Sequence, residues 1–140
     1  MTTTRQAIKL TDEGAQVLMG AAVEHARKMG VPQCIAIVDE GCNLMAFVRM
    51  EGSRLLSIRS SQRKAMTAAN SGRPTGGLAP DMETKLALAT DGDMVNLKGG
   101  LPIIVGGQVI GGIGVGSGTG EQDLEVANVA LKALSGATTF

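Results

Sequence analysis

The hydrophobic pattern near the start of the chain predicts an amphipathic helix over residues 12–29. Apolar side chains recur there every three or four positions, the spacing that places them on one face of a helix. Thr11 is a typical N-cap residue, and Gly30 ends the pattern. His25 lies on the apolar face of this predicted helix.

Two short apolar segments, residues 34–38 and 44–50, are separated by turn residues and predict a β-hairpin. Side chains alternate along a strand, so Met45, Phe47 and Arg49 are expected on the same face of the second strand. Arg49 therefore belongs to an otherwise apolar row.

A second hairpin is predicted from residues 102–105 and 108–115, joined by the Gly106-Gly107 turn. Glycines recur along its second strand and leave that strand with little side-chain bulk. We expect another element of the protein to pack closely against it.

Further helices follow from the same pattern. Ser53 can cap a helix that runs to about residue 70, and a short helix is expected over residues 81–89. Thr119 opens a Thr-x-x-Gln capping box, which predicts a last helix to about Leu134. Residues 94–97 are expected to form a weak strand or an irregular segment.

Helices alternating with hairpins indicate an antiparallel sheet covered by helices, which is an α+β fold. The length of 140 residues suits one domain with a single core, so residues 1–140 are expected to form one domain. With only two Phe and no Trp or Tyr, that core must consist of small and aliphatic side chains.

Charge and hydropathy exclude several kinds of partner. Thirteen basic residues balance thirteen acidic ones, so nucleic acid and anionic membrane, which bind surplus positive charge, are not expected partners. No apolar run approaches the roughly 18 residues of a membrane span. The start of the sequence lacks the apolar region of a secretory signal, which predicts a cytoplasmic protein.

His25 is the single histidine, which excludes zinc sites built from several histidines within one chain. A lone imidazole on an apolar helical face has two interpretations. It is either a hydrogen-bonded histidine of a core or interface, or an axial ligand of a flat apolar cofactor such as haem. Cys34 and Cys42 match no metal-binding spacing and are expected to be free thiols.

Charged side chains near apolar surfaces are the other candidates for chemistry. Arg49 and Lys64 are cations of this kind, and Glu121 is an acid at the start of the last predicted helix. The glycine-rich segment 111–120 before that helix superficially resembles a dinucleotide-binding loop, but too little chain follows to complete such a unit. The helix opening remains a candidate acceptor for a carboxylate or a haem propionate.

Four segments together resemble the GlcG/HbpS family of haem-binding-type proteins, which includes the C-terminal domain of PduO-type proteins. Their order and spacing cover nearly the whole chain. The segments are residues 35–52, the Arg-Lys-Ala-Met-Thr-Ala-Ala stretch at 63–69, the glycine-rich residues 99–115, and the Ser-Gly-Thr-Gly-Glu-Gln-Asp stretch at 117–123.

The resemblance implies a profilin-like three-layer α/β/α domain with a mostly antiparallel five-stranded sheet. It also implies assembly into a homo-oligomer, which the eight Met residues and the apolar helix faces favour independently. Members of this family include haem binders, redox sensors and proteins encoded in catabolic operons.

Two functional hypotheses follow from the resemblance and the residues together. In the first, the chain is a small cytoplasmic haem-binding or haem-sensing module, with His25 as the iron ligand and Arg49 or Lys64 pairing with the propionates. In the second, it is a lyase or isomerase of a catabolic pathway. Arg49 and Lys64 then hold the carboxylate of a metabolite, and Glu121 or His25 transfers a proton. A purely structural subunit is a third alternative.

Overall fold

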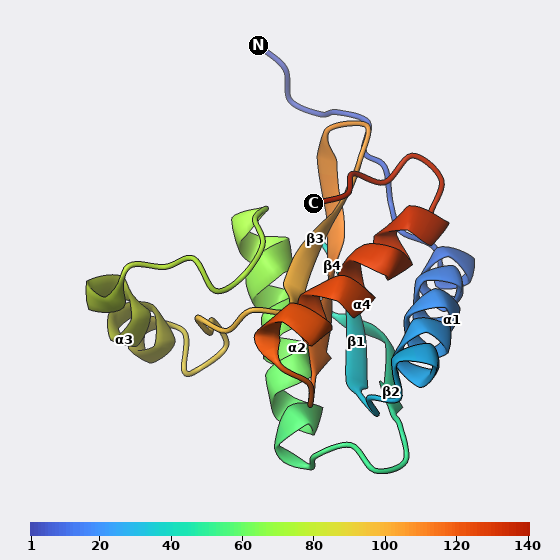
Figure 1. Ribbon diagram of the computed structural model, residues 1–140. Helices are drawn as coiled ribbons and strands as arrows, with labels where there is room; N and C mark the ends of the chain where they lie inside the picture. Colours follow the sequence, from blue (N-terminus) through green and yellow to red (C-terminus); the bar gives the residue numbers. More distant parts are fainter.

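An antiparallel sheet lies at the centre of the computed structural model, which describes residues 1–140 (Figure 1). Four strands pair in the order β2-β1-β4-β3, and both predicted hairpins are confirmed. The strands are β1 (Cys34–Asp39), β2 (Leu44–Arg49), β3 (Gly100–Val105) and β4 (Gln108–Gly116).

The fifth strand expected from the family resemblance is absent, which corrects that part of the prediction. Residues 94–97 are irregular because side chains, not a strand, satisfy the backbone around them. Val95 N donates to Thr67 Oγ1, and the Asn96 amide bonds to the backbone of Leu78. Along the outer edge of β3, Val105 makes an isolated bridge with Ala137.

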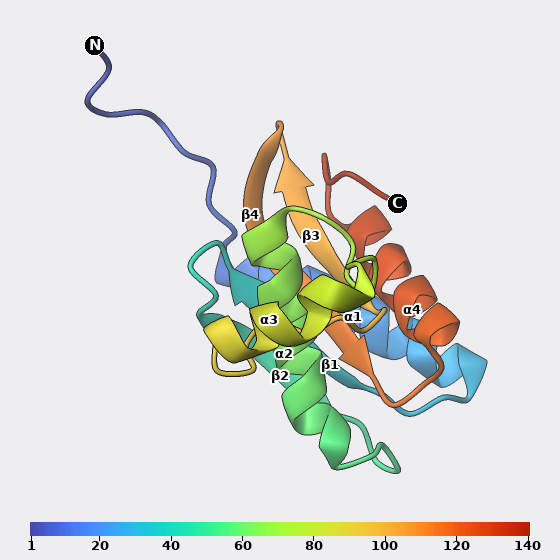
Figure 2. The ribbon, with the colours of Figure 1, turned by 90° about the vertical axis from the view of Figure 1, so that its left-hand side faces the viewer.

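Helices cover both faces of the sheet and give the three-layer α+β arrangement (Figures 1 and 2). α1 and α4 pack together on one face, and α2 packs on the other. α3 extends away from the sheet on the side of α2. No helix is long and apolar enough to span a bilayer. The helices are α1 (Asp12–Met29), α2 (Leu56–Ser71), α3 (Pro80–Ala89) and α4 (Gly120–Ala133).

Two of the three predicted N-cap residues cap their helices in the structure. The Thr11 side chain accepts a hydrogen bond from Gly14 N, and Thr119 forms the full capping box with Gln122. The predicted cap at Ser53 is wrong, because α2 begins three residues later and has no side-chain cap. Ser53 Oγ donates instead to Met50 O at 2.7 Å, which stabilises the turn that leaves β2.

A bulge in the first hairpin changes which side chains share a face. Ile37 pairs with Ala46 but Val38 pairs with Leu44, so Met45 is the extra residue of β2. Met45 therefore packs with the core beneath α1 and α4, whereas Phe47 packs toward α2. The prediction that Met45 shares a face of β2 with Phe47 and Arg49 is therefore wrong.

The glycines of β4 mark the closest approach of a helix to the sheet. A Cβ atom at Gly112 would overlap the carbonyl oxygen of Ala65, and one at Gly114 would overlap that of Ser61. Both carbonyls belong to α2, so the element expected against this glycine-rich strand is α2. The absence of side chains on this face of β4 lets the two backbones touch.

Gly114→Ala is expected to destabilise the fold by about 3 kcal/mol, because the added methyl must push α2 away from the sheet. The matched control is Gly20→Ala in α1, where a Cβ meets nothing within 4 Å. This control should stabilise the protein by about 0.5–1 kcal/mol, since alanine is the better helix former. Urea unfolding measures both, and equal effects of the two substitutions would contradict the close packing.

Candidate functional site

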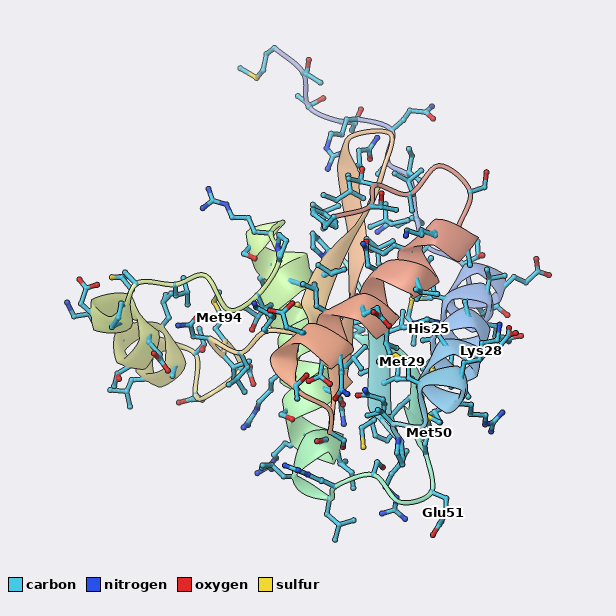
Figure 3. The ribbon with its side chains drawn as sticks, viewed as in Figure 1. His25, Lys28, Met29, Met50, Glu51 and Met94 are labelled. Atoms are coloured by element: carbon cyan, nitrogen blue, oxygen red, sulfur yellow. The ribbon has the colours of Figure 1, made fainter.

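His25 lies on α1 and faces α4 (Figure 3). Its Nε2 atom is 2.7 Å from Oε2 of Glu125, and 26% of its side chain is exposed. An ionised carboxylate only accepts hydrogen bonds, so the imidazole donates this one from Nε2. In the neutral ring, Nδ1 then keeps a lone pair that is free for another ligand.

This arrangement matches the chemistry of a histidine that binds a metal. Such histidines usually donate their second ring nitrogen to a carboxylate, which fixes the ring orientation and makes the ligating nitrogen more basic. Met29 lies one helical turn after His25 and packs partly against the core. The pair of His25 and Glu125 is the strongest candidate for cofactor chemistry in the chain.

Arg49 lies at the exposed end of β2 and lines a hollow of about 430 Å³. Arg27, from the last turn of α1, lines the same hollow, and neither arginine forms an ion pair. Glu51 is the carboxylate of the lining. The other lining residues give the hollow a largely apolar wall: Ala26, Gly30, Val31, Pro32, Val48 and Met50.

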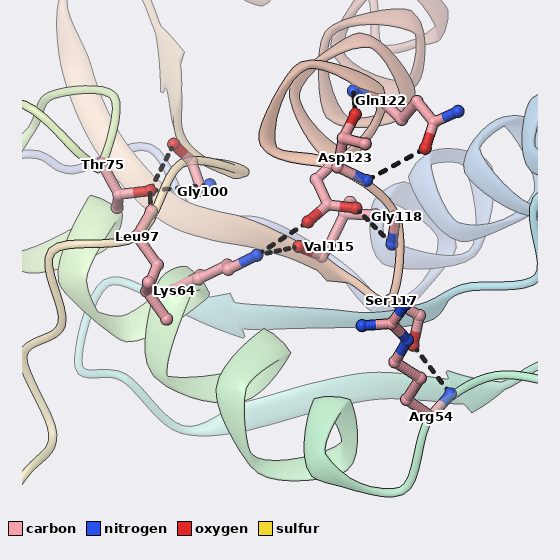
Figure 4. Close-up of polar contacts among 11 residues, drawn as sticks. Arg54, Lys64, Thr75, Leu97, Gly100, Val115, Ser117, Gly118, Gln122 and Asp123 are labelled. Atoms are coloured by element: carbon pink, nitrogen blue, oxygen red, sulfur yellow. Dashed lines mark hydrogen bonds and ion pairs between the residues drawn. The ribbon is translucent and has the colours of Figure 1, made fainter.

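Lys64 is buried, and its charge is already paired (Figure 4). Its Nζ atom donates to Oδ2 of Asp123 at 2.9 Å and to the carbonyl of Val115 at 2.8 Å. The other carboxylate oxygen of Asp123 accepts from Gly118 N at 2.9 Å. The buried Gln33 amide, oriented so that its nitrogen faces Asp123, donates to Oδ1 at 2.9 Å. This network joins α2, the end of β4 and the start of α4.

Glu121 is exposed on the first turn of α4 and forms an ion pair with Lys98. Several backbone donors at the glycine-rich opening of α4 bond within the chain. Gly118 N bonds to Asp123, and Gln122 N bonds to the Thr119 hydroxyl. These donors are therefore occupied by the chain itself.

The structure does not bring the sequence-predicted residues together in one site. His25 lies in the helix layer of α1 and α4, whereas Lys64 lies on α2, on the opposite face of the sheet. Arg49 lies at the hollow, whose lining includes neither of them. The ligand roles assigned to these residues stay predictions.

Sequence reasoning missed Arg27 and Glu125 because both depend on tertiary contacts. In the sequence, Arg27 looks like an ordinary basic residue of a last helical turn, and Glu125 lies 100 positions from its histidine.

The expected free thiols are confirmed at Cys34 and Cys42. Burial raises the pKa of the Cys42 thiol, and the nearby Asp39 and Asp93 charges raise it further, so its thiolate form is disfavoured.

An antiparallel sheet between helical layers defines the class of fold. The family model described as "Haem degrading protein HbpS-like" matches residues 10–132. The chain belongs to this family, which confirms the resemblance seen in the sequence.

Protein GlcG of Escherichia coli is 35% identical over 107 residues, which cover 76% of this chain and 80% of GlcG. The corrinoid adenosyltransferase PduO of Salmonella typhimurium is 32% identical over 123 residues. That match covers 84% of this chain but 37% of PduO, so the chain corresponds to one part of that longer protein.

Solved structures agree with the α+β fold and its antiparallel sheet. The crystal structure of the PduOC:heme complex has a TM-score of 0.86 and 29% identity, covering 94% of this chain and 99% of that chain. A double mutant of Streptomyces reticuli HbpS has a TM-score of 0.84 and 32% identity, covering 94% of this chain and 91% of that chain.

Lys64→Met is expected to destabilise the protein by about 3–5 kcal/mol, because it leaves the buried Asp123 carboxylate without its cation. Adding Asp123→Asn should restore a large part of this loss, since Asn still accepts from Gly118 N and carries no charge. Chemical denaturation of the single and double variants measures the coupling. Additive losses would show that the two side chains are not coupled.

Proposed function

We propose that this chain is a haem-binding module of the cytoplasm in which His25 ligates the iron. The observation that carries the proposal is the close likeness, over 94% of the chain, to a structure solved as a complex with haem. The geometry of His25 supports it, because Glu125 holds one ring nitrogen and leaves the other free.

The residues around His25 fit the donor chemistry that haem iron requires. Neutral imidazole is a common ligand of haem iron, and His25 would supply it. Glu125 orients the imidazole and makes it a stronger donor. Bound haem would supply the redox and gas-binding chemistry of its iron, on which a sensing role depends.

The site lies on an open surface, since the large hollows of the chain do not include His25 in their lining. Haem held by His25 would therefore be partly exposed and exchangeable, which suits a sensor better than a permanent carrier. Lys64 does not take part in this proposal, because Asp123 already compensates its charge. We include self-association in the proposal, as the family resemblance implied.

Haemin added to the purified protein is expected to give a Soret band distinct from that of free haemin, and His25→Ala should shift or remove it. Glu125→Gln should weaken haem affinity by about tenfold, the lower end of the effect of losing a carboxylate behind a ligating histidine. Absorption titration measures both effects.

The matched control is Glu24→Gln, which removes a carboxylate next to His25 in sequence whose ion-pair partner is Lys28. It should leave the spectrum unchanged. A wild-type spectrum equal to that of free haemin would reject haem binding, and an unchanged spectrum in His25→Ala would remove His25 from the site.

The hollow at Arg27 and Arg49 favours a second candidate function, binding of a small carboxylate-bearing metabolite. Two unpaired guanidinium groups beside an apolar wall suit a carboxylate attached to a short carbon chain. In the lyase or isomerase alternative, Glu51 takes the proton-transfer role in place of Glu121 or His25, since it is the carboxylate that lines this hollow.

Arg49→Met is expected to weaken binding of short mono- and dicarboxylates at least tenfold, because it deletes the charge and its donors while it keeps much of the stem volume. The melting temperature should change little, since Arg49 is exposed and unpaired. Calorimetric titration of a carboxylate panel measures the affinity, with Arg59→Met on α2 as control. Equal affinities in wild type and Arg49→Met would reject the site.

A further inference from the structure

α3 is a helix that its own chain does not bury. α3 makes no extensive contact with another helix or strand, and none of its residues is buried. Figures 1 and 2 show it displaced from the sheet, beyond α2. The surface of α3 is therefore almost entirely available to another molecule.

A helix of this kind is not stable by its own propensity. It has ten residues and no side-chain N-cap, whereas isolated helices shorter than about 12–15 residues are marginal in water. Most helical stability in proteins comes from packing an apolar face. We expect α3 to obtain this packing from a surface outside its own chain.

Side-chain hydrogen bonds fix the base of α3. The Asn96 side chain bonds to both the N–H and the carbonyl of Leu78, which joins the two segments that lead to and from α3. Thr75 is anchored to Gly100, at the start of β3, through its backbone and its hydroxyl. The projecting arm, residues 78–96, is thus an ordered extension.

The arm combines apolar and acidic side chains. Leu88 is 75% exposed and Met82 is 40% exposed, both high values for large apolar residues. The segment 81–93 carries four acidic residues and one lysine. A partner surface for the arm must therefore be apolar and basic.

The start of α2 has this character. Leu55 is 69% exposed and Leu56 is 77% exposed, so with Leu88 they are the most exposed large apolar residues after the terminal Met1. The segment 54–73 holds four arginines and no acidic residue, in addition to the buried and paired Lys64. We call the exposed surface of Arg54, Leu55, Leu56 and Arg59 the α2 patch.

We propose that the arm of one copy docks on the α2 patch of a second copy, with Leu88 against Leu55 and Leu56. The opposite charges of arm and patch select this pairing, while the net charge of zero avoids repulsion between whole copies. Each copy carries both surfaces, so a two-fold axis satisfies both arms at once. This inference rests on the self-association included in the proposed function and names its surface.

Light scattering of the wild type at micromolar concentration should give a mass of at least two chains. Leu88→Asp and Leu56→Asp should each weaken association at least tenfold and move the mass toward one chain. The control Leu44→Asp places the same charge at an exposed leucine on the far edge of the sheet, and it should keep the wild-type mass.

Charge exchange tests the pairing itself. Asp81→Arg and Arg59→Glu should each weaken association, and the double variant should regain it, because the reversed charges then meet across the interface. Circular dichroism checks that each variant is folded.

A monomeric wild type would overturn both self-association and this interface. A wild-type oligomer whose mass survives Leu88→Asp and Leu56→Asp would overturn the interface alone. Haem titration reads out the cofactor proposal separately.

Discussion

The contact between the backbone of α2 and the glycines of β4 determines where the functional side chains lie. Because Gly112 and Gly114 carry no side chains, α2 sits directly on the sheet. Lys64, on this helix, reaches past the end of β4 to Asp123 on the opposite layer. A larger residue in β4 would lift α2 and break this connection.

The buried Lys64–Asp123 pair in turn fixes the start of α4. Asp123 is held by Lys64, Gly118 N and the Gln33 amide, so the first turn of α4 has a defined position over the sheet. Glu125 follows Asp123 by two residues and meets His25 from there. The stability of the buried network and the geometry at His25 are therefore coupled through one helix.

The parts of the fold that depend on neighbouring residues could be predicted from the sequence. The caps at Thr11 and Thr119 involve contacts within four residues, and both are present. The glycine pattern of β4 predicted close packing but not the partner, because α2 comes from a distant part of the chain. Met45 was assigned to the wrong face because a single bulge reverses the alternation, and no local pattern marks that bulge.

The candidate site was less predictable than the fold for the same reason. His25 stands out as the single histidine, but its meaning depends on Glu125, which is 100 residues away in sequence. Lys64 and Arg49 look alike in sequence as cations beside apolar residues. The fold separates them, because it gives Lys64 a buried carboxylate 59 positions away and leaves Arg49 exposed with Arg27.

The proposed haem site and the proposed interface between copies lie on opposite faces of the sheet. His25 and Glu125 lie on the layer of α1 and α4, while the arm and the α2 patch belong to the side of α2. Docking through the arm would leave the His25 surface open, so a ligand there would not compete with assembly for space. The buried Lys64–Asp123 pair connects α2 with α4 directly, so it gives one physical route by which assembly on the α2 side could affect the geometry at His25.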